Sequence, residues 1–168
     1  MPKISALPEI SISDEALSNV LPIVVGMGGT PITKRIPFSL LLEAARYETI
    51  YLKVFDHDTE VASGTGKLYF VVPDALDGAV IVDIDIYTPV KGSSGLTEVD
   101  LYNVTNAQSV TPTNRASLSY AYYSTIDSGD TVTVVNGSLV AGNRIRVDVN
   151  SAAVGAKGLD VIIKVDLL

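Results

Sequence analysis

Residues 67–87 carry the feature that most constrains the fold, an alternation of apolar and polar residues with a period of two. Between residues 82 and 87 the apolar set is Val82, Ile84 and Ile86, and the polar set is Asp83, Asp85 and Tyr87. This pattern predicts a β-strand with one apolar face and one acidic, solvated face. Pro73 cannot donate to a ladder, and turn residues follow it, so the preceding strand ends there.

The same period governs the rest of the chain beyond residue 46. We expect strands at 49–55, 67–72, 80–87, 98–104, 116–121, 131–135, 144–149 and 159–167. Segments rich in glycine, serine and asparagine separate them and supply the turns. Eight short strands with one apolar face each predict an all-β fold, an antiparallel β-sandwich of jelly-roll type.

The first 46 residues lack this period and are expected to form an extended, proline-rich docking arm. Five of the eight prolines lie in the first 37 residues, where they exclude a long helix. Segments 20–25 and 33–36 are predicted to form a hairpin around a glycine-rich turn, and 37–46 a short helix near the end of the arm. A disordered tail is the alternative, but such tails are polar and highly charged, and this segment is neither. The predicted domains are therefore an arm, 1–46, and a body, 47–168.

The composition favours association with other protein chains. Charged residues make up 18% of the 168 residues, against about 25% in typical domains. The mean hydropathy is +0.34, yet no apolar run approaches the roughly 18 residues that span a membrane. We therefore expect no membrane partner and a homo-oligomer that covers the excess apolar surface.

The net charge of −7 lies entirely in residues 47–168, because the arm balances four basic against four acidic residues. An acidic body disfavours nucleic acid, whose phosphates need clustered lysine and arginine. The absence of cysteine excludes disulfides and thiolate metal sites. No apolar stretch follows Lys3, so we expect no signal peptide.

Three patterns hint at catalysis, and each has a simpler interpretation. His57 lies between Asp56 and Asp58, but no nucleophile elbow accompanies it, so a solvated loop is favoured. Residues 64–67 lack the flanking residues of a phosphate-binding loop. Asp83, Asp85 and Asp100 are the residue type that glycosidases use in pairs, yet acids two positions apart on a strand are usually a solvated face. We expect no enzyme, no cofactor and no metal.

Tyrosine is the more informative aromatic residue, with eight copies and no tryptophan. Tyr120, Tyr122 and Tyr123 cluster on or beside one predicted strand. Tyrosine combines a large contact area with one hydrogen-bonding group, which suits a sugar or protein surface. The three residues are candidates for surface recognition, and aromatic packing in the core and rim of a sandwich is the alternative.

The order of short motifs resembles that of tailed-bacteriophage virion structural proteins. In the arm these are Lys3-Ile-Ser-Ala-Leu-Pro8, Val20-Leu-Pro-Ile-Val-Val25, Thr33-Lys-Arg-Ile36 and Leu40 to Leu42, which look like the segment that fastens tail fibres and tailspikes to the particle. In the body, residues 66–73, 76–78, 101–105 and 155–161 are similar to small phage β-sandwiches. The resemblance implies a non-enzymatic virion part, usually a homotrimer, whose arm docks while its sandwich projects.

Two phage roles follow from the resemblance. A capsid decoration protein, or cement protein, needs only a clasp and a knob, which fits the length, whereas a tail fibre normally continues into a shaft and a receptor-binding tip. We therefore expect a decoration protein on the outer surface of the phage particle, bound to the major capsid protein or another virion protein and made in the host cytoplasm. A short tail-fibre or fibre-adaptor protein that binds host carbohydrate is the alternative, and a carbohydrate-binding or hydrolysing module is a third class. The expected arm anchors are Ile4, Leu7, Pro8, Leu21, Pro22, Ile23, Val25 and Leu41.

Overall fold

The computed structural model describes residues 20–25, 32–37 and 46–167. Contacts divide the chain into two compact units, 1–46 and 47–168, and each is described by itself. In the first unit, β1 (Val20–Val25) pairs with β2 (Ile32–Pro37) in an antiparallel hairpin. The predicted hairpin is thus present, with β2 one residue longer at each end than expected. Of the predicted helix, Pro37 instead ends β2, and 38–45 lie outside the described residues.

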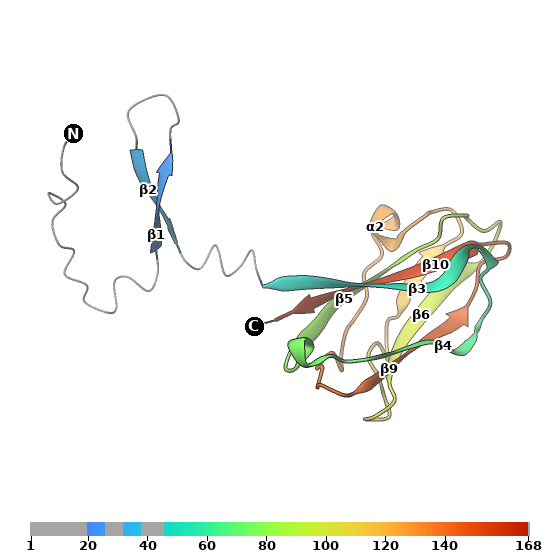
Figure 1. The fold of residues 1–168 in the computed structure, drawn as a ribbon. Helices are drawn as coiled ribbons and strands as arrows, with labels where there is room; N and C mark the ends of the chain where they lie inside the picture. The colour runs from blue at the N-terminus through green and yellow to red at the C-terminus, as the bar shows by residue number, and fades with distance from the viewer. Residues whose placement is uncertain (1–19, 26–31, 38–45, 168) are drawn as a thin grey trace, which may run out of the picture. The chain divides into compact units, whose positions relative to one another are not determined.

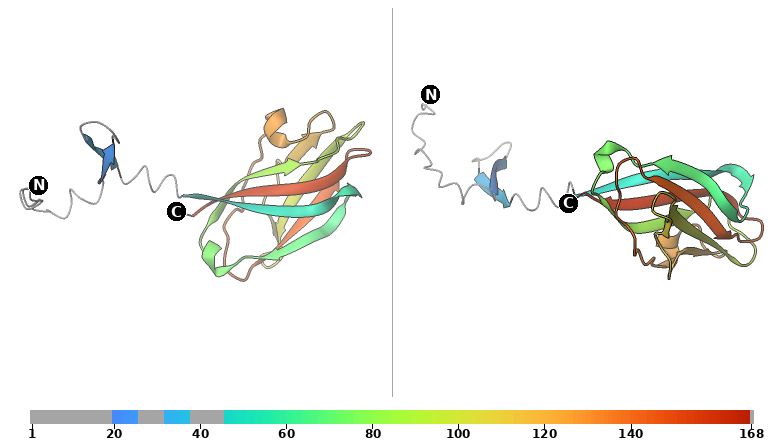
Figure 2. Two further views of the ribbon diagram at one scale, coloured as in Figure 1. Left: turned by 45° about the horizontal axis from the view of Figure 1, so that its top comes forward. Right: turned by 90° about the horizontal axis from the view of Figure 1, so that it is seen from below.

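The second unit, the body, contains a three-stranded antiparallel sheet. Its members are β3 (Tyr47–Glu60), β10 (Lys157–Asp166) and β5 (Val80–Tyr87), with β10 in the centre. Figure 2 shows the red β10 between the cyan β3 and the light green β5. A strand with neighbours on both edges and a core on one face needs an apolar inner row, and β10 has one.

A five-stranded antiparallel sheet completes the body. It runs from β4 (Gly64–Val71) through β9 (Arg144–Ser151) to β6 (Leu96–Asn103). The far edge of β6 pairs with two short strands, β8 (Ala116–Ser119) and β7 (Gln108–Ser109). A 3-10 turn, η2 (Asp74–Leu76), and a one-turn helix, α2 (Thr125–Ser128), lie in connecting segments of the body.

The strand order is that of a jelly roll. Strand β3 pairs with β10, β4 with β9, and β6 with β7, so later strands fold back onto earlier ones as nested pairs. Consecutive strands from β3 to β6 alternate between the two sheets (Figure 1). The predicted all-β, antiparallel sandwich of jelly-roll type is confirmed.

The core lies between the inner faces of the two sheets. From β10 come four fully buried aliphatic residues, Leu159, Val161, Ile163 and Val165. The facing sheet contributes Val99, Leu101, Ile145, Val147 and Val149, each at most 1% exposed. Both sets follow the period of two that the sequence shows, and each such side chain contributes roughly 1.5–3 kcal/mol through burial.

A β-bulge corrects the predicted apolar face of β5. The register pairs Asp83 with Lys164 but Ile81 with Val165, so Val82 is an extra residue in its strand. Val82 is 39% exposed, whereas Ile81 takes the inward position that alternation alone assigned to Val82. Ile84 and Ile86 are buried as expected.

The predicted strand at 131–135 is wrong, and β7 was not expected. The backbone N–H groups of Thr133 and Val135 donate to the carbonyls of Asn114 and Val110. Both acceptors lie in the segment between β7 and β8, outside any strand. Only an isolated bridge between Asn114 and Thr133 results. The segment's alternating residues are therefore held by scattered bonds rather than by a ladder.

The first and last strands of the body meet at one end. Tyr47 of β3 pairs with Asp166 of β10, and the same two strands pair through Glu60 and Lys157 at the opposite end. We call the first the entry end, because the chain from the first unit joins the body there, and the second the far end. Val61 also bonds to Ala156 at the far end, at 2.9 Å.

Candidate functional site

A small cavity lies on the outer face of the three-stranded sheet. It measures about 160 Å³, and its lining includes Tyr51, Lys53, Phe55, Tyr87, Pro89 and Asp160. The register pairs Asp160 with Lys53 on one side and with Tyr87 on the other. Three strands thus place a base, an acid and an aromatic ring in one row across the sheet. We call this cavity the Asp160 groove.

A hydrogen bond fixes the carboxylate in the groove. The Tyr51 hydroxyl donates to Asp160 Oδ2, and Asp160 is only 8% exposed. This bond, followed by partial burial and the negative charge of Asp160, raises the pKa of Tyr51 to about 12. Across the described part of the chain, no donor contacts the second oxygen, Oδ1. The groove therefore presents one oriented acceptor beside two phenol groups.

Gly158 forms part of the groove because only glycine fits there. Its φ is +68°, and a Cβ on it would lie 2.5 Å from Pro89 Cγ. The same Cβ would lie 3.1 Å from the His57 Cα. Three segments that line the groove therefore approach one another closely at this glycine.

The positive groups near the groove already have partners. Lys53 Nζ lies 3.7 Å from Asp56 Oδ1, and both side chains are exposed. Lys67 Nζ lies 5.8 Å from the centre of the Phe55 ring. His57 also lines the groove, with its Nδ1 3.5 Å from Asp58 Oδ1.

His57 belongs to β3 rather than to a loop, which corrects its predicted placement. The strand extends to Glu60 because Glu60 pairs with Lys157. The His57 side chain is 68% exposed and that of Asp58 is 99% exposed, so both are solvated. Solvent therefore surrounds the only histidine of the chain.

The fold does not bring the three predicted acids together. Asp83 and Asp85 lie on β5, whereas Asp100 lies on β6 in the other sheet. Asp85 Oδ1 accepts from the Thr125 hydroxyl at 2.7 Å, which ties α2 to β5. Asp83 accepts from the Ile84 backbone N–H at 2.9 Å.

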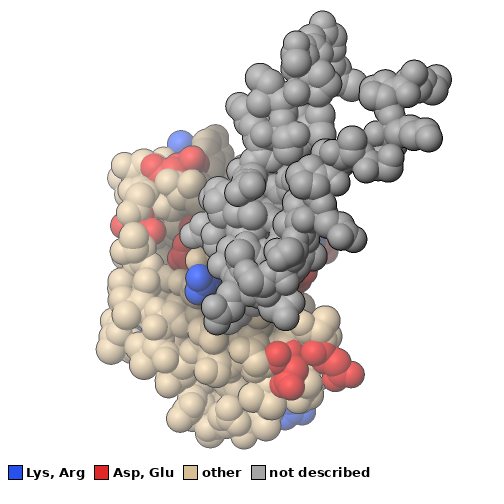
Figure 3. Space-filling model, turned by 90° about the vertical axis from the view of Figure 1, so that its left-hand side faces the viewer, with Lys and Arg blue, Asp and Glu red and all other residues tan. Residues whose placement is uncertain are grey.

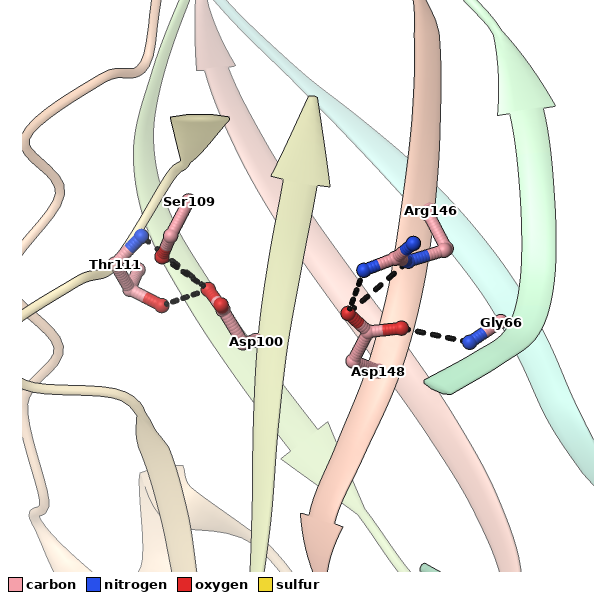
Figure 4. Close-up of polar contacts among 6 residues, drawn as sticks. All are labelled: Gly66, Asp100, Ser109, Thr111, Arg146 and Asp148. Carbon is pink, nitrogen blue, oxygen red and sulfur yellow. Dashed lines mark hydrogen bonds and ion pairs between the residues drawn. The ribbon is translucent and has the colours of Figure 1, made fainter. Parts of the chain in front are cut away.

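Asp100 instead lies opposite a second buried acid, Asp148 (Figure 4). Asp148 Oδ2 accepts from Arg146 at 2.7 Å and 3.1 Å, and its Oδ1 accepts from the Gly66 backbone at 2.6 Å. Asp100 Oδ1 accepts from the hydroxyls of Ser109 and Thr111, both at 2.8 Å. In Figure 4 the two carboxylates point in opposite directions. Their bonds tie the edge segments of the sheet to its centre, which is a structural role.

The three clustered tyrosines lie after the end of β8 and are exposed. Tyr120, Tyr122 and Tyr123 are 44%, 44% and 45% exposed. Lys91 Nζ lies 4.5 Å from the centre of the Tyr123 ring and donates to the Ala121 carbonyl. The cluster therefore belongs to the surface rather than to the core.

Of the expected arm anchors, Leu21, Pro22, Ile23 and Val25 lie on β1. Ile4, Leu7, Pro8 and Leu41 lie outside the described residues. Leu21, Ile23 and Val25 occupy alternate positions of the strand, which are positions on one face. The register places Leu21 opposite Ile36 and Val25 opposite Ile32.

A second hollow of about 160 Å³ is lined by amide side chains, those of Asn103, Asn106, Gln108 and Asn136 among them. Asn103 is buried and bonds to the Asn143 side chain at 2.9 Å and to the backbone N–H groups of 105 and 106. Asn136 donates to the Ser109 carbonyl at 2.7 Å. These amides are used to hold loops together.

The surface charge is dispersed on the face that Figure 3 shows. Acidic side chains lie there in several separate groups, with single basic side chains near some of them. Within ranges 20–25, 32–37 and 46–167, no cluster of three metal-ligating side chains occurs. The helices of this same described part are all too short or too polar to cross a membrane.

Comparisons with known proteins give no relative: no family model matches the chain, and no curated protein or solved structure matches it. The groove residues were missed at the sequence level, because Tyr51, Tyr87 and Asp160 are far apart in the chain. The available signal was Asp160, an acid between the apolar residues Leu159 and Val161.

Proposed function

We propose that this chain is a non-enzymatic structural protein of a tailed-bacteriophage virion, and specifically a capsid decoration protein. Its first unit attaches to the particle, and its jelly-roll body forms a knob on the surface. The observation that carries the proposal is the β1–β2 hairpin, a two-stranded sheet whose first strand is apolar at all six positions.

A two-stranded hairpin is marginal in water by itself. Positions 21, 23 and 25 are all aliphatic, and the residues opposite them are Ile36, Lys34 and Ile32, so five of the six positions in this row are aliphatic. Burying the aliphatic side chains of this row against another surface would stabilise the bound state by roughly 1.5–3 kcal/mol per side chain. The resemblance of this segment to phage anchoring segments supplies the candidate surface, a groove between virion subunits.

The body supports the same proposal through the position of its ends. The chain enters at Tyr47 beside the last paired residue, Asp166, so a tether from the first unit holds the sandwich at its entry end. The far end is then the part presented outward. A homotrimer would repeat this attachment three times, which slows dissociation through effective concentration.

The test of attachment uses particles stripped of the protein and then incubated with purified variants. Leu21→Ala with Ile23→Ala should reduce occupancy, because both anchors are lost. The matched control is Val20→Ala with Val24→Ala, which removes two aliphatic residues from the alternate positions of the same strand. Equal occupancy for both double variants would contradict the anchor assignment. Raising the salt concentration should have little effect, because the first 46 residues carry no net charge.

The decoration role has its own measurement. Decorated particles should retain DNA to a higher temperature than stripped ones, because a bridge between capsid subunits resists internal pressure. Particles that are equally heat-stable without the protein, but no longer adsorb to cells, would replace this role with that of a short tail-fibre or adaptor protein. The Asp160 groove favours that second candidate, since it lies on the half of the sheet toward the far end.

The oligomeric state is measured on the purified protein. Sedimentation equilibrium should give a mass about three times 17.8 kDa. A monomer at tens of micromolar would remove the homotrimer from the proposal, although a chain that assembles only on the particle would still show the occupancy effects above.

A further inference from the structure

We propose that the Asp160 groove is a binding site for one neutral pyranose unit of a carbohydrate. The inference goes beyond attachment to the particle and does not depend on it. It rests on the two tyrosines, the oriented carboxylate and the size of the cavity.

The aromatic groups of the groove supply flat apolar surface. Tyr51 is 59% exposed and Tyr87 is 37% exposed, and both line the cavity together with Phe55. A pyranose ring has faces of C–H groups that stack on aromatic rings, and a phenol adds a hydroxyl at the edge of that surface. Exposed aromatic residues on the outer face of a sheet cost stability in water, so a ligand that covers them gains from their burial.

The polar groups match the hydroxyls of a sugar. Asp160 Oδ2 is held by Tyr51, which leaves Oδ1 as an acceptor of fixed direction. Lys53 and the Tyr87 hydroxyl are donors at the same cavity, whereas the Tyr51 hydroxyl, which donates to Asp160, can only accept. A sugar hydroxyl both donates and accepts, so it can satisfy an acid and a donor placed side by side. Hydrogen bonds to a charged group are roughly twice as strong as neutral ones.

The charges favour a neutral ligand over an ion. Asp160 and Lys53 are opposite each other in the register of β10 and β3, and Tyr87 completes the row. One acid and one base give this row no net charge. A quaternary ammonium would be attracted by the carboxylate and the aromatic rings, but Lys53 would repel it. Lys67 also places a positive charge near the Phe55 ring. The negative charge of Asp160 would repel a phosphate. A neutral ring with several hydroxyls meets no repulsion.

The size of the groove limits the ligand. A volume of about 160 Å³ is below the range of roughly 300–1,000 Å³ for drug-sized ligands, so one ring fits rather than a chain. Binding of a single unit is then weak, with a dissociation constant on the order of 1 mM. Several copies of the protein on one particle would together bind a polysaccharide with repeated units much more tightly than one copy does.

The test titrates the full-length protein with methyl glycosides of glucose, mannose, galactose and N-acetylglucosamine, and follows backbone and tyrosine-ring NMR signals. At least one glycoside should produce saturable shifts at Gly158, Asp160 and the Tyr87 ring. Tyr87→Ala should weaken that binding about tenfold through the loss of stacking. Tyr51→Phe keeps the ring but releases the carboxylate, and it should weaken binding by a smaller factor. The control Tyr122→Ala, at an equally exposed tyrosine outside the groove, should leave the affinity unchanged.

The proposal is overturned if no glycoside gives saturable shifts in the groove up to about 50 mM, well above the expected dissociation constant. It is also overturned if Tyr87→Ala binds the glycoside with unchanged affinity, or if the shifts map to the Tyr120–Tyr123 surface. Tetramethylammonium and inorganic phosphate are titrated in parallel, and saturation of the groove by either one instead of a glycoside would assign it to an ion. In all variants the unperturbed part of the spectrum reports whether the body is folded.

Discussion

Asp100 on β6 lies directly opposite Asp148 on β9, and both residues are buried, at 6% and 7% exposure. Like charges in this position destabilise a sheet. Each carboxylate instead turns to its own donors, Asp148 to Arg146 and Gly66, and Asp100 to Ser109 and Thr111. The two acids therefore join the central strands of the five-stranded sheet to the segments at its edges, Asp148 to β4 and Asp100 to the segment of Ser109 and Thr111.

Arg146→Ala should lower the free energy of unfolding by about 2 kcal/mol. The substitution leaves Asp148 buried without its cation and opposite a second negative charge. It also removes the contact of the guanidinium with the Tyr102 ring, which lies 4.5 Å away. Urea denaturation followed by circular dichroism measures the loss.

The control for Arg146 is Arg144, an exposed residue two positions earlier in the same strand. Arg144→Ala should change the free energy of unfolding by less than about 0.5 kcal/mol. In the double variant Arg146→Ala with Asp148→Asn, part of the loss should return, because no unpaired charge remains buried. Additive losses would show that Asp148 does not depend on Arg146.

Leu101→Ala should cost about 2–5 kcal/mol, because the side chain is fully buried between the sheets. The matched control is Leu96→Ala on the same strand, where the leucine is 42% exposed. Thermal and urea unfolding of both variants give the comparison. A larger loss for Leu96 than for Leu101 would contradict the assignment of the inner face of β6.

Gly158→Ala should destabilise the body more than Gly155→Ala. Both glycines have positive φ, +68° and +75°, and an alanine in this conformation costs roughly 1–2 kcal/mol. At Gly155 a Cβ meets nothing within 4 Å, so this cost is the whole effect. At Gly158 the Cβ would also clash with Pro89, which should add about 1–3 kcal/mol. Equal unfolding midpoints for the two variants would contradict the tight packing at Gly158.

Seven of the eight expected strand segments coincide with observed strands, because each has a face of aliphatic residues that only the core can satisfy. The inner row of β10 is the clearest case, since its four aliphatic residues keep strict alternation from 159 to 165. Alternation failed at Val82, where a bulge shifts the face by one residue. A bulge depends on the pairing with β10, and the sequence of β5 alone contains no sign of it.

The site could be predicted only in part. The solvated character of His57 follows from its charged neighbours, and the position of Asp83, half-buried beside the buried Ile84, follows from the alternation along its strand. The groove does not, because Tyr51, Tyr87 and Asp160 meet through the order β3-β10-β5, which the jelly-roll topology determines. The pairing of Asp100 with Asp148 depends on the register of β6 and β9 in the same way.

The hydrogen bond between Tyr51 and Asp160 should be visible as a delayed ionisation. The pKa of Tyr51 is raised from the ordinary value of 10 to about 12, first by that bond and then by burial and the charge of Asp160. The neutral phenol is therefore favoured in the folded chain. Its contribution to stability is fully present below pH 10 and is lost as the pH rises toward 12. The contribution is small, because Tyr51 is 59% exposed and solvent screens it.

Tyrosine Cζ NMR signals recorded at about pH 11, above the ordinary tyrosine pKa, make the comparison. Tyr51 should remain neutral there, whereas free tyrosine added to the same sample as a reference should be ionised. Asp160→Asn removes the negative charge and should let Tyr51 ionise at lower pH, whereas Asp85→Asn, on the neighbouring strand, should not. If Tyr51 in the unmodified chain ionises at the same pH as the free tyrosine reference, the phenol does not donate to Asp160, and the carboxylate in the groove loses the orientation on which sugar binding depends.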